Sequence, residues 1–90
     1  MNIDFNNIRD TYGDDVILSI RDNIDDVNEN IDYLKELKFT DVEDIFERYA
    51  LLFLYTPSEF KERFDELIKR LGNNYVDIIE NDLSNLEELL

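Results

Sequence analysis

Helix-start and helix-stop signals divide this chain more clearly than any other feature of its sequence. Three segments have the capping-box spacing, in which a hydroxyl accepts the third N–H of a helix and a glutamate reaches back to the cap: Thr40-Asp41-Val42-Glu43, Thr56-Pro57-Ser58-Glu59 and Ser84-Asn85-Leu86-Glu87. Pro57 falls at a first helical position, where its missing N–H loses no hydrogen bond. Gly13 and Gly72, the only glycines, stand where helices end in a left-handed conformation. Because so little turn material remains, helices must dominate.

Apolar residues recur at helical spacing between these signals. One stripe comprises Val27, Ile31, Leu34 and Leu37, and a second comprises Phe60, Phe64, Leu67, Ile68 and Leu71. The second stripe has a charged back face with three acid-first i,i+4 pairs: Glu59/Arg63, Asp65/Lys69 and Glu66/Arg70. We predict helices over 3–12, 14–23, 25–38, 41–54, 57–71, 74–82 and 85–90. The stretch 16–20 would also suit a buried strand, but no partner strand is evident.

The chain has the size and apolar content of one small domain. Its 90 residues are 43% hydrophobic, enough to fill a thin core. A spacing of 33 residues maps Val27, Ile31 and Leu34 onto Phe60, Phe64 and Leu67, although two unrelated amphipathic helices could match by chance. We therefore predict a single all-α domain over 1–90. It would be a compact bundle or a short helical repeat of six or seven short helices, with units near 13–39, 40–72 and 73–90.

The segment from Leu34 to Leu52 resembles a repeat of the mitochondrial transcription termination factor family. Those repeats run from a leucine-rich helix through leucine-glycine-phenylalanine and a short acidic helix to a proline-leucine-leucine ending. Here Lys38 stands in the glycine position, and Ala50 and Leu83 stand in proline positions. The resemblance implies an architecture of stacked helical repeats. In the family the concave surface is basic and binds nucleic acid, and the charge of this chain argues against carrying that function over.

Acidic residues outnumber basic residues by 23 to 9, which gives a net charge of −14. Residues 1–34 carry nine acids and two bases, and residues 73–90 carry five acids and no base. Such a surface repels nucleic acid and anionic lipid and attracts basic partners. Solubility is the simpler interpretation, and several aspartates would also complement helix dipoles. The candidate acidic surface comprises Asp14, Asp15, Asp22, Asp25, Asp26, Glu29, Asp77, Glu80, Asp82, Glu87 and Glu88.

The residues needed for most catalytic and metal sites are missing. Without histidine or cysteine there is no Ser-His or Cys-His pair and no imidazole or thiolate ligand. Neither glycine belongs to a phosphate-binding loop. A calcium loop beginning at Asp22 would place Ile24 and Val27 where an oxygen ligand and glycine are required. We therefore predict no enzyme activity, no cofactor and no metal. The N-terminus lacks a signal peptide and no apolar run could span a membrane, so we expect a cytoplasmic protein.

The run from Ala50 to Tyr55 is apolar on every side of a helix. It is either a buried central element or a surface for a partner or a homodimer. The candidate partner-binding residues are Leu51, Leu52, Leu54, Tyr55 and Phe60. The heptad spacing of Phe39, Phe46, Phe53 and Phe60 crosses two helix starts, so we expect these rings to fill the core.

The composition favours a non-catalytic, acidic helical module that binds another protein, one with a basic surface. The alternative is a nucleic-acid mimic that occupies the basic groove of a DNA- or RNA-binding protein, with carboxylates in place of phosphates. The asparagine-, aspartate- and isoleucine-rich usage is typical of an AT-rich bacterial or phage genome, and small phage-encoded inhibitors have this kind of composition.

Overall fold

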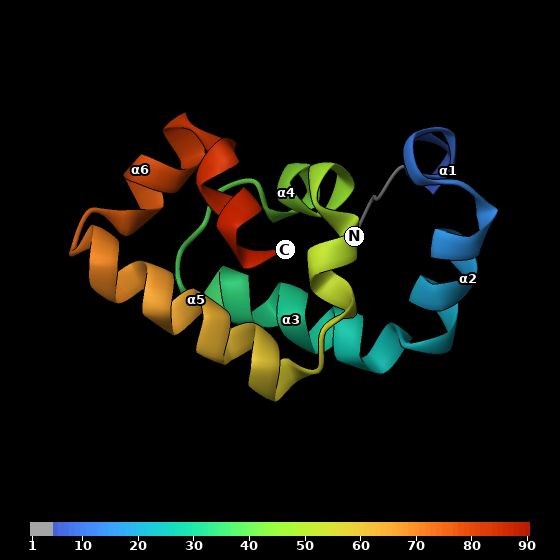
Figure 1. Cartoon of the computed structure of the whole chain (residues 1–90), viewed down its shortest axis with the longest axis horizontal. Coiled ribbons are helices and arrows are strands. Elements are labelled where there is room, and N and C mark those ends of the chain that lie inside the picture. The colour runs from blue at the N-terminus through green and yellow to red at the C-terminus, as the bar shows by residue number, and fades with distance from the viewer. Residues whose placement is uncertain (1–4) are drawn as a thin grey trace.

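In a computed structural model that describes residues 5–90, short helices follow one another with few connecting residues (Figure 1). The elements are α1 (Phe5–Tyr12), α2 (Asp14–Asp22), α3 (Ile24–Glu36), α4 (Val42–Arg48), the 3-10 helix η1 (Ala50–Leu54), α5 (Pro57–Leu71), α6 (Tyr75–Asn81) and the 3-10 helix η2 (Leu83–Leu89). None of the described residues forms a strand. The all-α prediction and the helix over 14–23 are confirmed. Residues 3 and 4 of the first predicted helix lie outside the described residues.

The glycine and proline signals are confirmed, whereas two of the three capping boxes are wrong. Gly13 and Gly72 have φ angles of 94° and 83°, in the left-handed region that favours glycine. Thr56 Oγ1 caps α5 by accepting from the N–H of Glu59 at 3.4 Å, with Pro57 in the first turn.

The other two boxes fail because an aspartate one or two residues away, which is also a strong helix cap, takes the role. Asp41 rather than Thr40 caps α4, by accepting from the N–H of Asp44 at 3.1 Å. Asp82 caps η2 by accepting from the N–H of Ser84 at 3.1 Å. The Thr40 N–H instead donates to Glu80 of α6 at 2.9 Å, and the Thr40 hydroxyl is also hydrogen-bonded to that carboxylate.

The single helix predicted over 41–54 is wrong, because α4 ends at Arg48 and the chain continues as η1. Tyr49 breaks the helix with φ −128° and ψ 43°. Side chains from two distant elements bind carbonyls at this break and at the far end of η1. The Tyr12 hydroxyl of α1 donates to the Arg48 carbonyl, and the Asn30 amide of α3 donates to carbonyls at the end of η1. These contacts depend on the tertiary fold, so the local apolar pattern carries no sign of them.

The helix predicted over 25–38 also ends early, in a Schellman motif centred on Lys38. The N–H of Phe39 donates to the Leu34 carbonyl at 3.3 Å, and the N–H of Lys38 donates to the Lys35 carbonyl at 3.1 Å. Lys38 has a φ of 76°, the only positive value for a non-glycine residue among residues 5–90. The burial of Phe39 against the core holds this strained turn in place.

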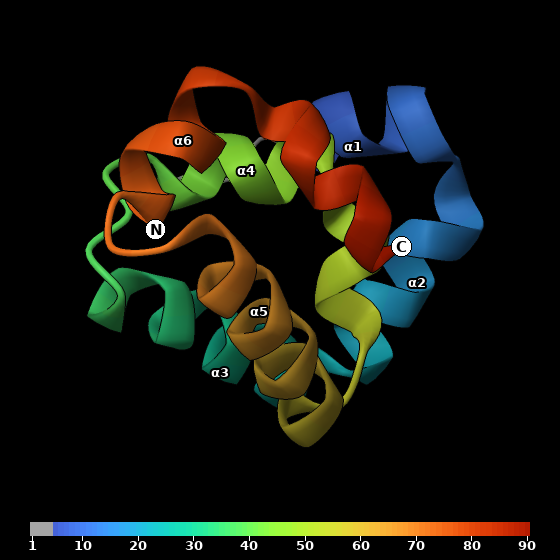
Figure 2. The ribbon, with the colours of Figure 1, turned by 60° about the vertical axis from the view of Figure 1, so that its left-hand side comes forward.

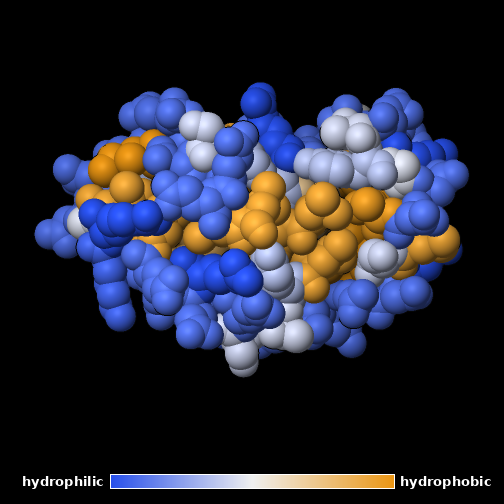
Figure 3. All heavy atoms as spheres, viewed as in Figure 1, coloured by the Kyte–Doolittle hydropathy of each residue, from blue (hydrophilic) through white to orange (hydrophobic). Residues whose placement is uncertain are grey.

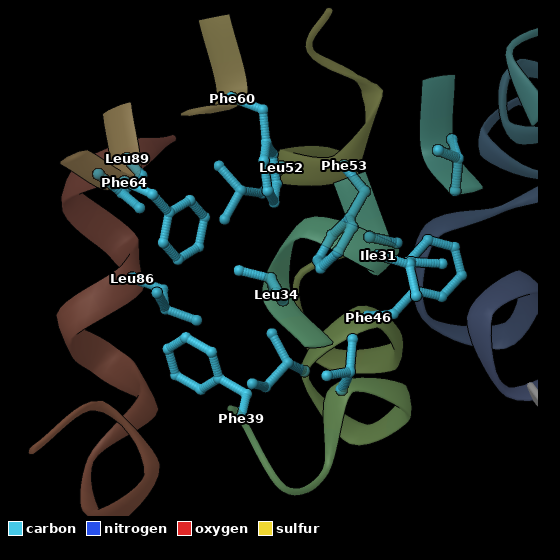
Figure 4. Close-up of a cluster of buried hydrophobic side chains, with 14 of the residues drawn as sticks. Ile31, Leu34, Phe39, Phe46, Leu52, Phe53, Phe60, Phe64, Leu86 and Leu89 are labelled. Atoms are coloured by element: carbon cyan, nitrogen blue, oxygen red, sulfur yellow. The ribbon is translucent and has the colours of Figure 1, made fainter. Parts of the chain in front are cut away.

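The helices surround one core in which rings from three successive elements touch (Figure 4). Phe46 of α4 lies edge-on to Phe53 of η1 with ring centres 5.1 Å apart, and Phe53 lies 5.1 Å from Phe60 of α5. Phe64, one turn further along α5, lies 4.7 Å from Phe60. All four rings are fully buried. The prediction that the heptad phenylalanines fill the core is therefore confirmed.

The 33-residue spacing in the sequence recurs in the order of the elements. Each of α5, α6 and η2 begins 33 residues after α3, α4 and η1 respectively. The two long helices, α3 and α5, lie side by side and bury their matched apolar stripes (Figures 1 and 2). The preceding helices α1 and α2 pack against each other and contact α4 and η1. They form the end of the molecule opposite α6 (Figure 1).

Candidate protein-binding surface

The η1 segment divides the five predicted partner-binding residues between core and surface. Leu52 and Phe60 are fully buried, so the prediction that they contact a partner is wrong. Leu51 is 45% exposed, whereas Leu54 and Tyr55 are half-buried. Residues three apart in a 3-10 helix lie above one another, so Leu51 and Leu54 share one side of η1. That side is what remains of the predicted site.

A buried asparagine fixes the position of η1. The Asn30 amide nitrogen donates to the carbonyl oxygens of Phe53 at 3.0 Å and Tyr55 at 2.9 Å. Because both partners are acceptors, they define which end of the amide carries its nitrogen. The Asn30 oxygen is buried and has no hydrogen-bond partner. We infer that Asn30 closes the last turn of η1 against α3 and thereby sets the position of Leu51.

Tyr55 is held by contacts within the chain on two sides. Its hydroxyl donates to the Leu90 carbonyl at 3.1 Å, and the Arg63 guanidinium lies 4.3 Å from the centre of its ring. Arg63 also binds Glu59 at 3.0 Å, as the i,i+4 spacing predicted. That hydrogen bond to Glu59 raises the pKa of Arg63. Tyr55 therefore joins α5 to the C-terminal segment. Of Leu51 and Tyr55, Leu51 is the residue more available to a partner.

A groove at the N-terminal end of the molecule was not predicted from the sequence. It has a volume of about 370 Å³ and is lined by residues of α1, α2 and the start of α3: Phe5, Arg9, Ile17, Ile20, Arg21 and Ile24. Phe5 and Ile24 are each 41% exposed, and Leu18 of α2 is 50% exposed. Arg9 and Arg21 are the only basic residues among the first 34. That isolated pair was the signal in the sequence that could have marked this groove.

Apolar side chains gather in a band across one face of the molecule (Figure 3). In that view the band covers η1 and runs toward α1 and α2. The helix α2 contacts η1, so the two surfaces adjoin. We use the name apolar band for six exposed or half-buried apolar residues of η1, α1, α2 and the start of α3: Phe5, Ile17, Leu18, Ile24, Leu51 and Leu54. Its exposed members, Phe5, Leu18, Ile24 and Leu51, come from four successive or contacting elements, α1, α2, α3 and η1.

Four of the predicted acidic residues have partners within the chain. Asp14 lies 3.5 Å from Arg9, Glu80 binds Thr40, and Asp82 caps η2. The hydrogen bonds from Ser84 lower the pKa of Asp82. Glu88 binds Arg70, which therefore does not form the i,i+4 pair predicted with Glu66. These carboxylates already contribute to the fold.

The other predicted acids lie at the surface, and three of them meet at the junction of α2 and α3. Asp22, Asp25 and Asp26 line a shallow hollow of about 220 Å³. Asp15, Glu29, Asp77 and Glu87 are exposed on α2, α3, α6 and η2. Among residues 5–90 no group of three or more aspartates and glutamates is placed to hold a metal ion. The exposed acidic side chains are therefore spread over several elements, from α2 to η2.

Comparison with protein-family models, with curated proteins and with solved structures gives no significant match to this chain. Within the described part of the chain, no helix has the length and apolar character needed to cross a membrane. The function must therefore be inferred from the surface itself.

Proposed function

We propose that this protein is a non-catalytic, acidic helical module that binds another protein through the apolar band. The observation that supports this most directly is the exposure of Leu18 and Leu51, at 50% and 45%, on two adjoining elements of a highly charged chain. Single exposed leucines are ordinary, but a gathered apolar patch ringed by polar residues is typical of an interaction site.

The contacts that hold η1 in place also support this proposal. Asn30 binds two carbonyls at the end of the segment that carries Leu51, and Phe53 packs between Phe46 and Phe60 beneath it. A side chain held in place by its surroundings loses little conformational entropy when a partner covers it. Leu51 is therefore exposed on a backbone segment that is held in place, which suits an anchor residue in an interface.

The test is affinity capture from the native host with matched variants. The double variant Leu18→Ser/Leu51→Ser removes two exposed members of the apolar band. The control Ile78→Ser changes a residue of α6 that is 36% exposed at the opposite end of the molecule. We expect proteins retained by the wild type and by Ile78→Ser to be lost by the double variant. If the double variant retains the same proteins at the same level, the apolar band is not the binding surface.

A second candidate function, a nucleic-acid mimic, is favoured by the exposed carboxylates. The hollow between α2 and α3 gathers Asp22, Asp25 and Asp26, and residues 73–90 contain no base. Carboxylates in place of phosphates would occupy a basic groove with a steep salt dependence. In the capture experiment, this function predicts that the retained proteins bind nucleic acid and elute at moderate salt. It also predicts that Asp22→Asn/Asp25→Asn weakens capture more than Leu18→Ser/Leu51→Ser does.

A further inference from the structure

The N-terminal groove is lined by two arginines on a protein of net charge −14. Both basic residues of the first 34 line it, and no acidic residue among residues 5–90 does. Arg9 has one weak ion pair, with Asp14 at 3.5 Å, in which both side chains are more than half exposed. Arg21 has no ion pair within residues 5–90. Two guanidinium groups are thus available beside an apolar floor.

The floor of the groove is built to receive bulky apolar groups. Ile20 is buried beneath it, Ile17 is half-buried, and Phe5 and Ile24 extend the apolar surface to the rim. The guanidinium group matches the planar geometry of a carboxylate and can bind it through two parallel hydrogen bonds. A fitting occupant therefore carries a carboxylate next to a large apolar side chain.

We propose that the groove docks an amphipathic segment of a partner protein, one that bears aspartate or glutamate beside leucine, isoleucine or phenylalanine. This inference rests on the proposed binding function and specifies the chemistry of the partner at one end of the apolar band. It reverses the expectation from net charge alone, by which the partner should be basic. Repulsion by the other carboxylates extends only about 8 Å at physiological ionic strength, so the local contact with Arg9 and Arg21 can prevail.

The exposed rim favours a polypeptide segment over a free amphiphile, because Phe5 and Ile24 offer apolar contact beyond the groove itself. A second copy of this chain is disfavoured because each copy carries a net charge of −14.

The probes are two helical peptides of about 15 residues, long enough to form a helix, with identical leucine positions and with either glutamate or lysine at every charged position. Binding is followed by nuclear magnetic resonance at 0.15 M salt, through the methyl groups of Ile17, Ile20 and Ile24 and the side-chain N–H of Arg21. The variant Arg9→Gln/Arg21→Gln removes both guanidinium groups. The control Lys35→Gln/Lys69→Gln makes the same change in net charge at exposed positions outside the groove.

We expect the glutamate peptide to shift the groove methyl signals and the lysine peptide to leave them unchanged. The arginine variant should weaken binding of the glutamate peptide by roughly 3- to 10-fold, from two exposed charge contacts, and the lysine control should not. Circular dichroism confirms that each variant is folded.

Three results of the peptide experiment would overturn the proposal. In the first, the lysine peptide shifts the groove methyl signals as strongly as the glutamate peptide does, and in the second neither peptide shifts these signals. In the third, the signals shift with protein concentration alone, which identifies a second copy as the occupant. If the arginine variant still captures the host proteins that Leu18→Ser/Leu51→Ser loses, the proposed function stands and this inference alone fails.

Discussion

Replacing Asn30 with alanine should destabilise the fold far more than the same change two residues earlier. Asn30→Ala removes two hydrogen bonds, at 3.0 and 2.9 Å, and leaves the Phe53 and Tyr55 carbonyls without that donor. Each lost bond is worth about 1 kcal/mol, and an unsatisfied buried carbonyl adds about 1 kcal/mol or more. Alanine recovers about 0.5 kcal/mol of helix propensity, so we expect a net loss of roughly 2–3 kcal/mol.

Asn28 is the matched control, because it lies on the same helix and is exposed. Asn28→Ala gains the same helix propensity and loses no buried contact, so its effect should range from zero to a gain of about 0.5 kcal/mol. Urea unfolding followed by circular dichroism measures both free energies of unfolding. For a domain of this size, the Asn30 loss corresponds to a fall in Tm of roughly 10–20 °C. If the two variants differ by less than about 0.5 kcal/mol, Asn30 does not anchor η1 and the account of this segment is wrong.

Three further predictions follow from the same structure. Lys38→Gly should raise the free energy of unfolding by about 1 kcal/mol, because glycine tolerates the positive φ. Lys35→Gly, in the preceding helical turn, should lower the free energy of unfolding by about 1 kcal/mol. Equal effects of the two variants in urea unfolding would contradict the Schellman assignment. Burial and the neighbouring Asp65 raise the pKa of Tyr33 to about 12, which a difference titration of the wild type and Tyr33→Phe at the phenolate absorbance would detect. Because the fold favours the neutral phenol, its contribution to stability is complete below pH 10 and is lost between pH 10 and 12; a Tyr33 that ionises near pH 10 would contradict this. Added sodium chloride should raise Tm by screening the repulsion among 23 acidic residues. A decrease in Tm as the salt concentration rises from low to moderate would instead mean that the ion pairs dominate.

The sequence predicted those parts of the fold that local chemistry controls. Gly13, Gly72 and Thr56 act at a single turn of the backbone, so their positions and types were enough to place helix ends. The stripe of α5 has strict helical spacing, and Phe60, Phe64 and Leu67 of it are buried while Ile68 and Leu71 are half-buried. By contrast, Tyr12 binds the carbonyl at the break after Arg48 and Asn30 binds the Phe53 carbonyl near the end of η1, across 36 and 23 residues of sequence. Contacts of that kind exist only once the helices have packed.

The candidate binding surface was predicted less completely, for a related reason. In a run that is apolar on every side, spacing alone gives no indication of which residue faces outward, and only the observed 3-10 turn separates exposed Leu51 from buried Leu52. The residues that line the N-terminal groove all lie within 5–24, but the groove forms only through the way the three helices α1, α2 and α3 pack, which helical spacing does not specify. The resemblance to the mitochondrial transcription termination factor repeats stays a prediction. Lys38, which occupies the family's glycine position, does have the backbone conformation that glycine favours.

Photo-crosslinking in the native host tests the central claim most directly. A photoreactive amino acid placed at Leu18, at Leu51 or at Ile78 reports which face of the folded protein lies against another macromolecule. The account predicts discrete crosslinked protein at Leu18 and Leu51 and none at Ile78. Equal crosslinking at all three positions, or crosslinking at Ile78 alone, would contradict it.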